Sequence, residues 1–281
     1  MTKIAKPVAQ SRGWPALPTH GALLMGVLNV TPNSFSDGGV FAGKEAALAQ
    51  AQRIIDEGAD ILDIGGESTH PLAAPVDADE ELARVRPVLE ALSGQIALPL
   101  SIDTYKASVA KVALELGAAI VNDVWGLQRD PAIADVAAEY GAGVCIMHNR
   151  TGFDPALDVI GDIRRFFDRS LAIAERAGIR RDAIVLDPGI GFGKTFNQNL
   201  LVLNRLDLLM DYGLPLLIGC SRKGFIGKIT GQAVAAERLS GSLGAHVAAV
   251  MKGARIIRAH DIAAHREALA VVAAIGRETT D

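Results

Sequence analysis

The feature that most constrains the fold is a regular alternation of short apolar runs with longer amphipathic ones. Near-continuous runs of Val, Ile and Leu are typical of strands in a parallel sheet that is covered on both faces. The stretches between them have helical periodicity, and several end in Gly-Ala, where the glycine stops the helix before the next strand. The apolar runs span residues 22–31, 61–68, 99–104, 119–124, 142–148, 183–189, 215–221 and 254–261.

Eight strand–helix units within 281 residues predict an α/β fold of the (β/α)8 TIM barrel type. An open, doubly wound sheet is the alternative for such an alternation. No linker or change of composition divides the chain. We therefore expect a single domain over residues 21–281, preceded by a poorly ordered lead-in over residues 1–20.

Charge and composition argue against several classes of protein. The net charge of −4 and the pI of 5.9 provide no basic surface for nucleic acid. The N-terminal segment lacks the apolar stretch of a secretory signal, and no run is long enough to span a bilayer. Cys145 and Cys220 each lie alone within an apolar run, which predicts buried thiols in a reducing cytosol. We expect a cytoplasmic protein that binds neither nucleic acid nor membrane.

Polar side chains gather at the end of every predicted strand. The carboxyl ends of barrel strands share one rim, where enzymes of this fold have their active sites. One or two polar ends would suit ordinary turns or helix caps, but eight together predict a site. These residues are Asn29 and Thr31; Asp63, Glu67, Ser68 and Thr69; Asp103 and Thr104; Asn122 and Asp123; His148 and Asn149; Asp187; Ser221, Arg222 and Lys223; and Arg258, His260 and Asp261.

One subset of these residues has the chemistry to bind a flat heterocycle with an amidine-like edge. It comprises Asp103, Asn122, Asp187 and Lys223. Carboxylates accept hydrogen bonds from ring N–H groups and an exocyclic amine, and an amide both accepts and donates. A structural ion pair between Asp187 and Lys223 is the plainer alternative for those two.

A second subset, Asn29, Arg258 and His260, suits a phosphate-bearing group. Arg258 and His260 are anion-binding side chains, although a lone rim histidine is more often structural. The Asn29 carbonyl is a suitable single ligand for Mg²⁺, which takes most of its ligands from water and substrate phosphates. A phosphate site near the last two strands is common in this fold.

Other motifs narrow the chemistry by exclusion. Residues 187–195, Asp-Pro-Gly-Ile-Gly-Phe-Gly-Lys-Thr, lack the glycine spacing of a phosphate-binding loop, so we expect them to bring backbone and Phe192 close to a planar ligand. No dinucleotide fingerprint and no zinc-ligand spacing is present. The breaker-rich segments 32–44 and 69–77 follow strands and suit either mobile lids or plain connectors.

Seven motifs, in order, resemble those of the dihydropteroate synthase family. They are residues 25–39, 63–69, 101–104, 121–123, 187–194, 221–223 and 258–261, and the similarity extends from residue 21 to residue 275. The resemblance implies a transferase of folate biosynthesis that joins 6-hydroxymethyl-7,8-dihydropterin pyrophosphate to p-aminobenzoate with Mg²⁺, and that forms a homodimer through its late helices. Small residues that suit close helix packing there, or equally packing against the barrel, are Gly241, Gly244, Ala245, Ala248 and Ala249.

The resemblance also implies a role for each matching residue. The pterin-binding positions are Asp103, Asn122, Met147, Asp187 and Lys223. The pyrophosphate-binding positions are Asn29, which is also the metal ligand, and His70, Arg258 and His260. The p-aminobenzoate-binding positions are Thr69, Pro71, Phe192 and Lys223. The catalytic positions are Asp103, Asp187, Lys223, Arg258 and His260.

The sequence departs from the family pattern in three places. His70 stands where the family has a phosphate-contacting arginine, Gly224 replaces a serine near the p-aminobenzoate carboxylate, and residues 147–152 read Met-His-Asn-Arg-Thr-Gly. These changes leave open a paralogue that binds pterin without synthase activity. A methyltransferase that moves a methyl group from methyltetrahydrofolate to a corrinoid protein shares the pterin-binding residues, but it does not require Asn29 together with Arg258 and His260.

Overall fold

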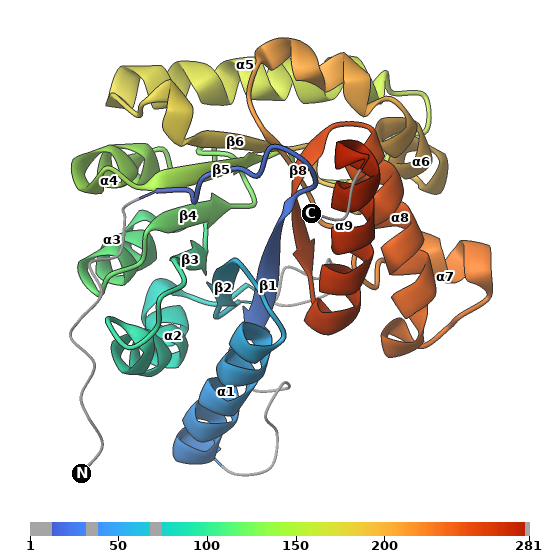
Figure 1. Cartoon of the computed structure of the whole chain (residues 1–281). Coiled ribbons are helices and arrows are strands. Elements are labelled where there is room, and N and C mark those ends of the chain that lie inside the picture. Colours follow the sequence, from blue (N-terminus) through green and yellow to red (C-terminus); the bar gives the residue numbers. More distant parts are fainter. Residues whose placement is uncertain (1–12, 32–38, 68–74, 279–281) are drawn as a thin grey trace.

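The computed structural model describes residues 13–31, 39–67 and 75–278. Its strands form one closed, parallel barrel in the order β1 to β8, surrounded by helices (Figure 1). This confirms the predicted (β/α)8 barrel and excludes an open sheet. The strands are β1 (Leu23–Asn29), β2 (Ile61–Gly65), β3 (Leu100–Asp103), β4 (Ile120–Asp123), β5 (Gly143–Met147), β6 (Ile184–Asp187), β7 (Leu216–Ile218) and β8 (Ala254–Ala259).

Each of the first six strands leads into one outer helix, whereas β7 leads into two helices before β8 begins. Short 3₁₀ segments, η2 (Arg181–Ala183), η3 (Leu206–Tyr212) and η4 (Ala235–Arg238), join some of these elements. The helices are α1 (Gly39–Asp56), α2 (Ala78–Leu92), α3 (Ala107–Glu115), α4 (Ala132–Tyr140), α5 (Val159–Ala177), α6 (Phe196–Asn204), α7 (Gly224–Thr230), α8 (Leu239–Met251) and α9 (Ile262–Arg277).

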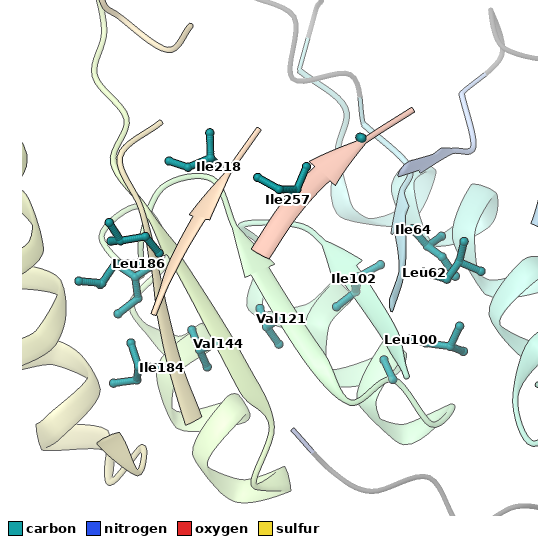
Figure 2. Close-up of a cluster of buried hydrophobic side chains, with 14 of the residues drawn as sticks. Leu62, Ile64, Leu100, Ile102, Val121, Val144, Ile184, Leu186, Ile218 and Ile257 are labelled. Carbon is teal, nitrogen blue, oxygen red and sulfur yellow. The ribbon is translucent and has the colours of Figure 1, made fainter. Parts of the chain in front are cut away.

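The strands bury both of their faces, which explains why their sequences are nearly continuous apolar runs. Alternate residues point outward into a core shared with the helices; Figure 2 labels ten of them, from Leu62 on β2 to Ile257 on β8. The intervening residues, such as Met25 and Ile256, fill the barrel interior. Toward the carboxyl ends of the strands the inward positions become polar, so the site lies directly next to the interior core.

Residues 13–20 differ from the expected poorly ordered lead-in. Trp14 Nε1 donates to the carbonyl of Ala183 at 3.0 Å, and Trp14 and Leu17 pack against the interior core where the strands begin. A Cβ atom on Gly143 would meet the Trp14 indole at 2.9 Å, so this glycine leaves room for the ring. The segment thus covers the amino-terminal end of the barrel, because its two large apolar side chains find a buried surface there.

The predicted loop over residues 32–44 is shorter than expected at its carboxyl end. Helix α1 begins at Gly39, whereas the sequence suggested a start near Lys44. Gly39 and Gly43 argue against helix by propensity, but the first turn has few internal hydrogen bonds to lose. Residues 32–38 of this loop and residues 69–74 of the second predicted loop lie outside the described residues.

The described ranges contain no helix with the length and apolar character needed to cross a membrane. Cys145 and Cys220 are both free and buried, as their apolar sequence surroundings predicted.

Candidate active site

A cavity of about 810 Å³ opens at the carboxyl ends of the strands. Its volume is in the usual range for a small-molecule site. The predicted residues Thr69, His70 and Pro71 lie outside the described residues. All of the other predicted site residues line the cavity together: Asn29, Asp103, Asn122, Met147, Asp187, Phe192, Lys223, Arg258 and His260.

Two carboxylates share one arginine at the floor of the cavity. Arg258 Nη2 donates to Asp103 Oδ2 at 2.7 Å, and its Nε donates to Asp63 Oδ2, also at 2.7 Å. Asn122 Nδ2 donates to the same Asp63 oxygen at 3.0 Å. A single guanidinium charge opposes but does not cancel the effect of burial, which raises the pKa of Asp103 to about 7.

Asp63 is a site residue whose role sequence reasoning did not identify. It is fully buried, and its Oδ1 atom has no hydrogen-bond partner within the described residues. A signal was present, because Asp63 falls two residues after Ile61 and so points to the same inward face of β2. Its function in the fold is to orient Arg258 and Asn122 toward the cavity.

Asp187 ends β6 and is anchored by its own loop. Its Oδ1 atom accepts a hydrogen bond from the backbone N–H of Gly189 at 2.7 Å. Burial raises the pKa of Asp187 to about 6, against the opposing effects of this hydrogen bond and of the Lys223 and Lys194 charges. The carboxylate is therefore ionised at neutral pH but costly to keep so without a bound partner.

Lys223 does not form the plain ion pair with Asp187 that was the structural alternative; no direct contact of this kind is found in the described part of the chain. Its Nζ atom lies 4.1 Å from the centre of the Phe192 ring, in cation–π geometry. Burial, and then repulsion by Arg258, lower the pKa of Lys223 to about 8. Phe192 and Lys223 together form a flat, positively charged wall of the cavity.

A buried lysine holds the glycine-rich segment after β6 in place. Lys194 Nζ donates to the carbonyl oxygens of Gly189 at 2.8 Å and Phe192 at 3.2 Å, and it lies 2.7 Å from His148 Nδ1. Gly189 has a φ of 67°, and a Cβ there would lie 1.9 Å from the His148 carbonyl oxygen. The glycine thus lets the loop pass over the tip of β5, and Lys194 is a second residue that sequence reasoning did not assign to the site.

His260 is oriented by a serine from the neighbouring strand. Its backbone N–H donates to Ser221 Oγ at 3.2 Å, and its Nδ1 atom lies 2.9 Å from the same oxygen. In the neutral tautomer that carries its proton on Nε2, the Nδ1 atom accepts a hydrogen bond from the Ser221 hydroxyl. Burial and the nearby Arg258 charge lower the pKa of His260 to about 4, which favours a neutral imidazole at pH 7.

Several polar strand ends prove to be structural. Glu67 pairs with the partly buried Lys106. Asp123 accepts hydrogen bonds from two backbone N–H groups of the turn that follows β4. Asp261 pairs with Arg222. The carboxyl rim therefore combines ligand-facing groups with groups that fix the loops, and only the fold separates the two kinds.

Comparison with known proteins identifies close relatives. Residues 25–260 match the family of pterin binding enzymes. The chain is 45% identical to a dihydropteroate synthase of Bacillus subtilis over 240 residues, which cover 85% of this chain and 84% of the relative. A dihydropteroate synthase from Clostridium difficile, solved in the presence of pteroic acid, has 46% identity and a TM-score of 0.89, and the match covers 93% of this chain and 100% of that one.

A dihydropteroate synthase from Xanthomonas albilineans, solved in complex with 7,8-dihydropteroate, is similar to nearly the same extent. It has 43% identity and a TM-score of 0.84, and the match covers 91% of this chain and 94% of that one. The likeness therefore extends over the entire barrel and includes the strands that carry the cavity.

Proposed function

The chain belongs to the pterin binding enzyme family, among the dihydropteroate synthases, and from this membership we propose a role for each group in the cavity. The enzyme condenses 6-hydroxymethyl-7,8-dihydropterin pyrophosphate with p-aminobenzoate to give 7,8-dihydropteroate and pyrophosphate. The observation that carries the assignment of roles is the cavity itself, in which acceptors at the floor and cations around them converge from different strands.

The pterin ring is assigned to the floor of the cavity. Asp103 and Asp187 are placed to accept hydrogen bonds from ring N–H groups and the exocyclic amine, and Asn122 supplies an amide beside them. Met147 provides an apolar contact on the same wall. N–H donors of the pterin ring favour the charged forms of both carboxylates, because a hydrogen bond to an ionised carboxylate stabilises it.

The pyrophosphate is assigned to Arg258 and His260. A guanidinium can bind two phosphate oxygens at once, and the Nε2 proton of His260 can be donated to a third oxygen. Arg238 and Arg222, the latter paired with Asp261, also line the cavity. The arginine that the family resemblance implies at position 70 is His70 in this chain, and it lies outside the described residues.

Asn29 is the residue we assign as the protein ligand of Mg²⁺. It is exposed at the end of β1 and lines the cavity, and the described ranges contain no cluster of three acidic, histidine or cysteine side chains that would form a closed metal site. One neutral oxygen facing solvent fits a cation that takes its remaining ligands from water and substrate phosphates. When bound, Mg²⁺ supplies charge neutralisation for the departing pyrophosphate.

Replacing Asn29 with Ala is expected to raise the Mg²⁺ concentration needed for the half-maximal rate by about tenfold, because one of few protein ligands is lost. The measurement is the initial rate of pyrophosphate release as a function of Mg²⁺ concentration. Asn149→Ala is the matched control, since Asn149 follows β5 at the same rim but does not line the cavity. Equal Mg²⁺ dependence in both variants would remove Asn29 as the ligand.

The p-aminobenzoate is assigned to the wall formed by Phe192 and Lys223. The phenyl ring of Phe192 suits contact with the aromatic ring, and the Lys223 ammonium suits the carboxylate. Space beside Gly224 is open, because a Cβ placed there would have no neighbour within 4 Å. Thr69 and Pro71 are assigned to the same subsite from the family resemblance and lie outside the described residues.

In the reaction, the bond between the pterin methylene carbon and the pyrophosphate oxygen breaks, and the electron pair leaves with pyrophosphate. Arg258 and His260 stabilise the charge that develops on the leaving group. The positive charge left on the methylene and ring is stabilised by Asp103 and Asp187. The aniline nitrogen then forms the new C–N bond and releases a proton to solvent; no side-chain base is needed, since an arylamine is neutral at pH 7.

The test of this function is the coupling between the two substrates. Pyrophosphate release from the pterin substrate is measured with Mg²⁺, with and without p-aminobenzoate, while dihydropteroate is detected by chromatography. We expect release and product to rise together when p-aminobenzoate is added. Pterin binding without product would indicate the inactive paralogue, and methyl transfer from methyltetrahydrofolate would indicate the methyltransferase.

A homodimer through the outer face of α8 is part of the proposal. Gly244, Ala248 and Met251 recur at helical spacing and are exposed, and the Met251 side chain is 67% accessible. Gly241 and Ala249, by contrast, pack within the chain; a Cβ on Gly241 would meet Ile226 at 2.3 Å. Of the small residues noted in the sequence, Gly241 and Ala249 therefore pack within the chain, whereas Gly244 and Ala248 lie on an exposed surface.

Met251→Glu is expected to convert the dimer to a monomer, because it introduces a charge into the exposed apolar stripe of α8. Sedimentation velocity reports the change of mass, and circular dichroism reports whether the barrel remains folded. Glu267→Gln on α9, a surface change away from this stripe, is the control. A wild-type protein that sediments as a monomer would contradict the proposal.

The cytoplasm is the proposed location. Two free, buried cysteines in a chain without a disulfide among its described residues suit a reducing compartment.

A further inference from the structure

The segment that follows β7 and includes Arg222, here called the tip of β7, has a backbone conformation that surrounding residues must hold in place. Arg222 has a φ of 60°, in the left-handed region that residues other than glycine seldom occupy. The residues on either side both serve the site, since Ser221 hydrogen-bonds His260 and Lys223 lies over Phe192. The angle at Arg222 therefore decides how two adjacent side chains enter the cavity.

Three residues hold Arg222 in this conformation: Ser242, Arg238 and Asp261. Its backbone N–H donates to Ser242 Oγ at 2.9 Å, and its carbonyl oxygen accepts from Arg238 Nη1 at 2.9 Å. Its guanidinium binds the carboxylate of Asp261, with Nε 3.1 Å from Oδ2. These contacts join the tip of β7 to α8, to η4 and to the tip of β8.

A pair of buried histidines completes this network at Cys220, two residues before Arg222. The backbone N–H of Cys220 donates to His246 Nε2, on α8, at 2.8 Å. His246 Nδ1 lies 2.8 Å from His265 Nε2, on α9, and His265 Nδ1 lies 2.6 Å from the carbonyl oxygen of Asp261. The backbone of β7 is thus linked through two rings to Asp261, the residue that binds Arg222.

The two ends of this hydrogen-bond chain, the Cys220 N–H and the Asp261 carbonyl, fix the position of every proton between them. The Cys220 N–H can only donate, so His246 Nε2 must accept and the proton of that ring is on Nδ1. The Asp261 carbonyl can only accept, so the proton of His265 is also on Nδ1. His246 Nδ1–H then donates to His265 Nε2, and all four ring nitrogens are satisfied with one proton on each ring.

An additional proton on either ring would place two donors face to face. Both side chains are 1% exposed, and burial lowers the pKa of each, that of His246 well below its ordinary value. The groups that face the pair reinforce or oppose this effect: His265 and His260 disfavour a charge on His246, and Asp261 favours one on His265. Arg222 in turn neutralises Asp261.

We propose that His246 and His265 are positioning residues for the condensation, and that as a neutral pair they fix the tip of β7 so that Ser221 and Lys223 face the cavity. This inference rests on the proposed function, in which Lys223 and His260 bind the substrates. The pair touches no substrate. It acts through Cys220 and Asp261 on the strained residue between Ser221 and Lys223.

The first test is spectroscopic and does not depend on activity. Long-range ¹H–¹⁵N NMR of protein labelled at histidine distinguishes the two neutral tautomers and the charged form, and His246→Gln and His265→Gln assign the signals. We expect both residues to be neutral Nδ1–H tautomers at pH 7.5 and to remain neutral at pH 5.5. An Nε2–H tautomer, or protonation of either ring by pH 5.5, would overturn the proposal.

The second test separates positioning from general stability. His246→Leu removes the acceptor of the Cys220 N–H and is expected to lower kcat about tenfold through misplacement of Lys223. His246→Gln keeps a neutral group that accepts and donates, and it should restore kcat to within about twofold of the wild-type value. Leu114→Ala, a buried change on α3, is the control; it should lower the urea midpoint and leave kcat unchanged.

The outcomes separate this proposal from the function on which it rests. A wild-type enzyme that couples the two substrates while His246→Leu retains full kcat would refute the positioning role alone. A wild-type protein without coupled turnover would refute the proposed function, and the tautomer spectrum would still report on the pair.

Discussion

Asp187→Asn is expected to lower kcat by about two to three orders of magnitude, because in the proposed mechanism it removes a negative charge that stabilises the developing pterin cation. The geometry of the site should survive the change. The amide oxygen of Asn can still accept the hydrogen bond that Gly189 N–H gives to Asp187 Oδ1. Steady-state rates of dihydropteroate formation, with both substrates saturating, provide the measurement.

Asp187→Asn should also make the free protein more stable at neutral pH. The folded-state pKa of Asp187 is raised to about 6, so the folded protein prefers the protonated form. The free energy of unfolding therefore decreases as the pH rises from the pKa of Asp187 in the unfolded chain toward 6. Asn does not titrate, so it abolishes this decrease. The gain in the free energy of unfolding should be on the order of 1–3 kcal/mol at pH 8 and near zero at pH 4, measured by urea unfolding.

Asp168→Asn on α5 is the control for both measurements, since this carboxylate binds Tyr212 outside the cavity. A variant of Asp187 with wild-type kcat would refute the electrostatic role. Low kcat combined with a large loss of stability would instead indicate that Asp187 has a structural role in the loop.

Arg258→Met is expected to cost both activity and stability. The guanidinium binds Asp63 and Asp103, which are buried, and its removal leaves two carboxylates without their charge partner. Breaking a buried pair in this way destabilises a protein by about 3–5 kcal/mol. In the proposed mechanism Arg258 is the main cation at the leaving group, so its loss should lower kcat by on the order of 10³.

A double-mutant cycle with Asp63→Asn tests the cause of the stability loss. If the uncompensated Asp63 charge is responsible, Arg258→Met combined with Asp63→Asn should recover at least about 1 kcal/mol of the free energy of unfolding. The double variant should remain inactive, because the leaving group still lacks its cation. Additive stability changes would show that Asp63 and Arg258 are not coupled.

Arg258→Lys is a useful intermediate variant. Lysine keeps the charge but cannot bridge two carboxylates with a planar fork. We expect partial stability and a rate between those of wild type and Arg258→Met. Rates equal to wild type would show that only the charge matters at this position.

The sequence alone was sufficient for the architecture of the barrel. Eight apolar runs, each followed by a helical stretch, leave few arrangements that bury both faces of every strand. The polar residues at the strand ends were therefore predictable as one rim, and Asp103, Asn122, Asp187, Lys223 and Arg258 do line one cavity. Local patterning carries this information because strand direction and side-chain alternation are short-range properties.

The sequence could not separate polar strand ends that face a ligand from those that fix a loop. Glu67 and Asp261 looked like site residues, yet they pair with Lys106 and Arg222. The sequence also predicted a poorly ordered lead-in over residues 1–20. In the structure, Trp14 packs against a buried surface formed by the amino-terminal ends of strands that are distant in sequence. Such contacts depend on which residues the closed barrel brings together.

The pairings within the site were decided by the tertiary structure. Asp63 and Arg258 are 195 residues apart in the chain and meet because β8 closes the barrel against β1, beside β2. His246 and His265 carry no motif, and their shared proton chain exists only because α8 and α9 pack together behind the tip of β7. Sequence patterns indicate the chemistry of each strand end. Burial, charge pairing and proton position depend on neighbouring residues, which only folding brings together.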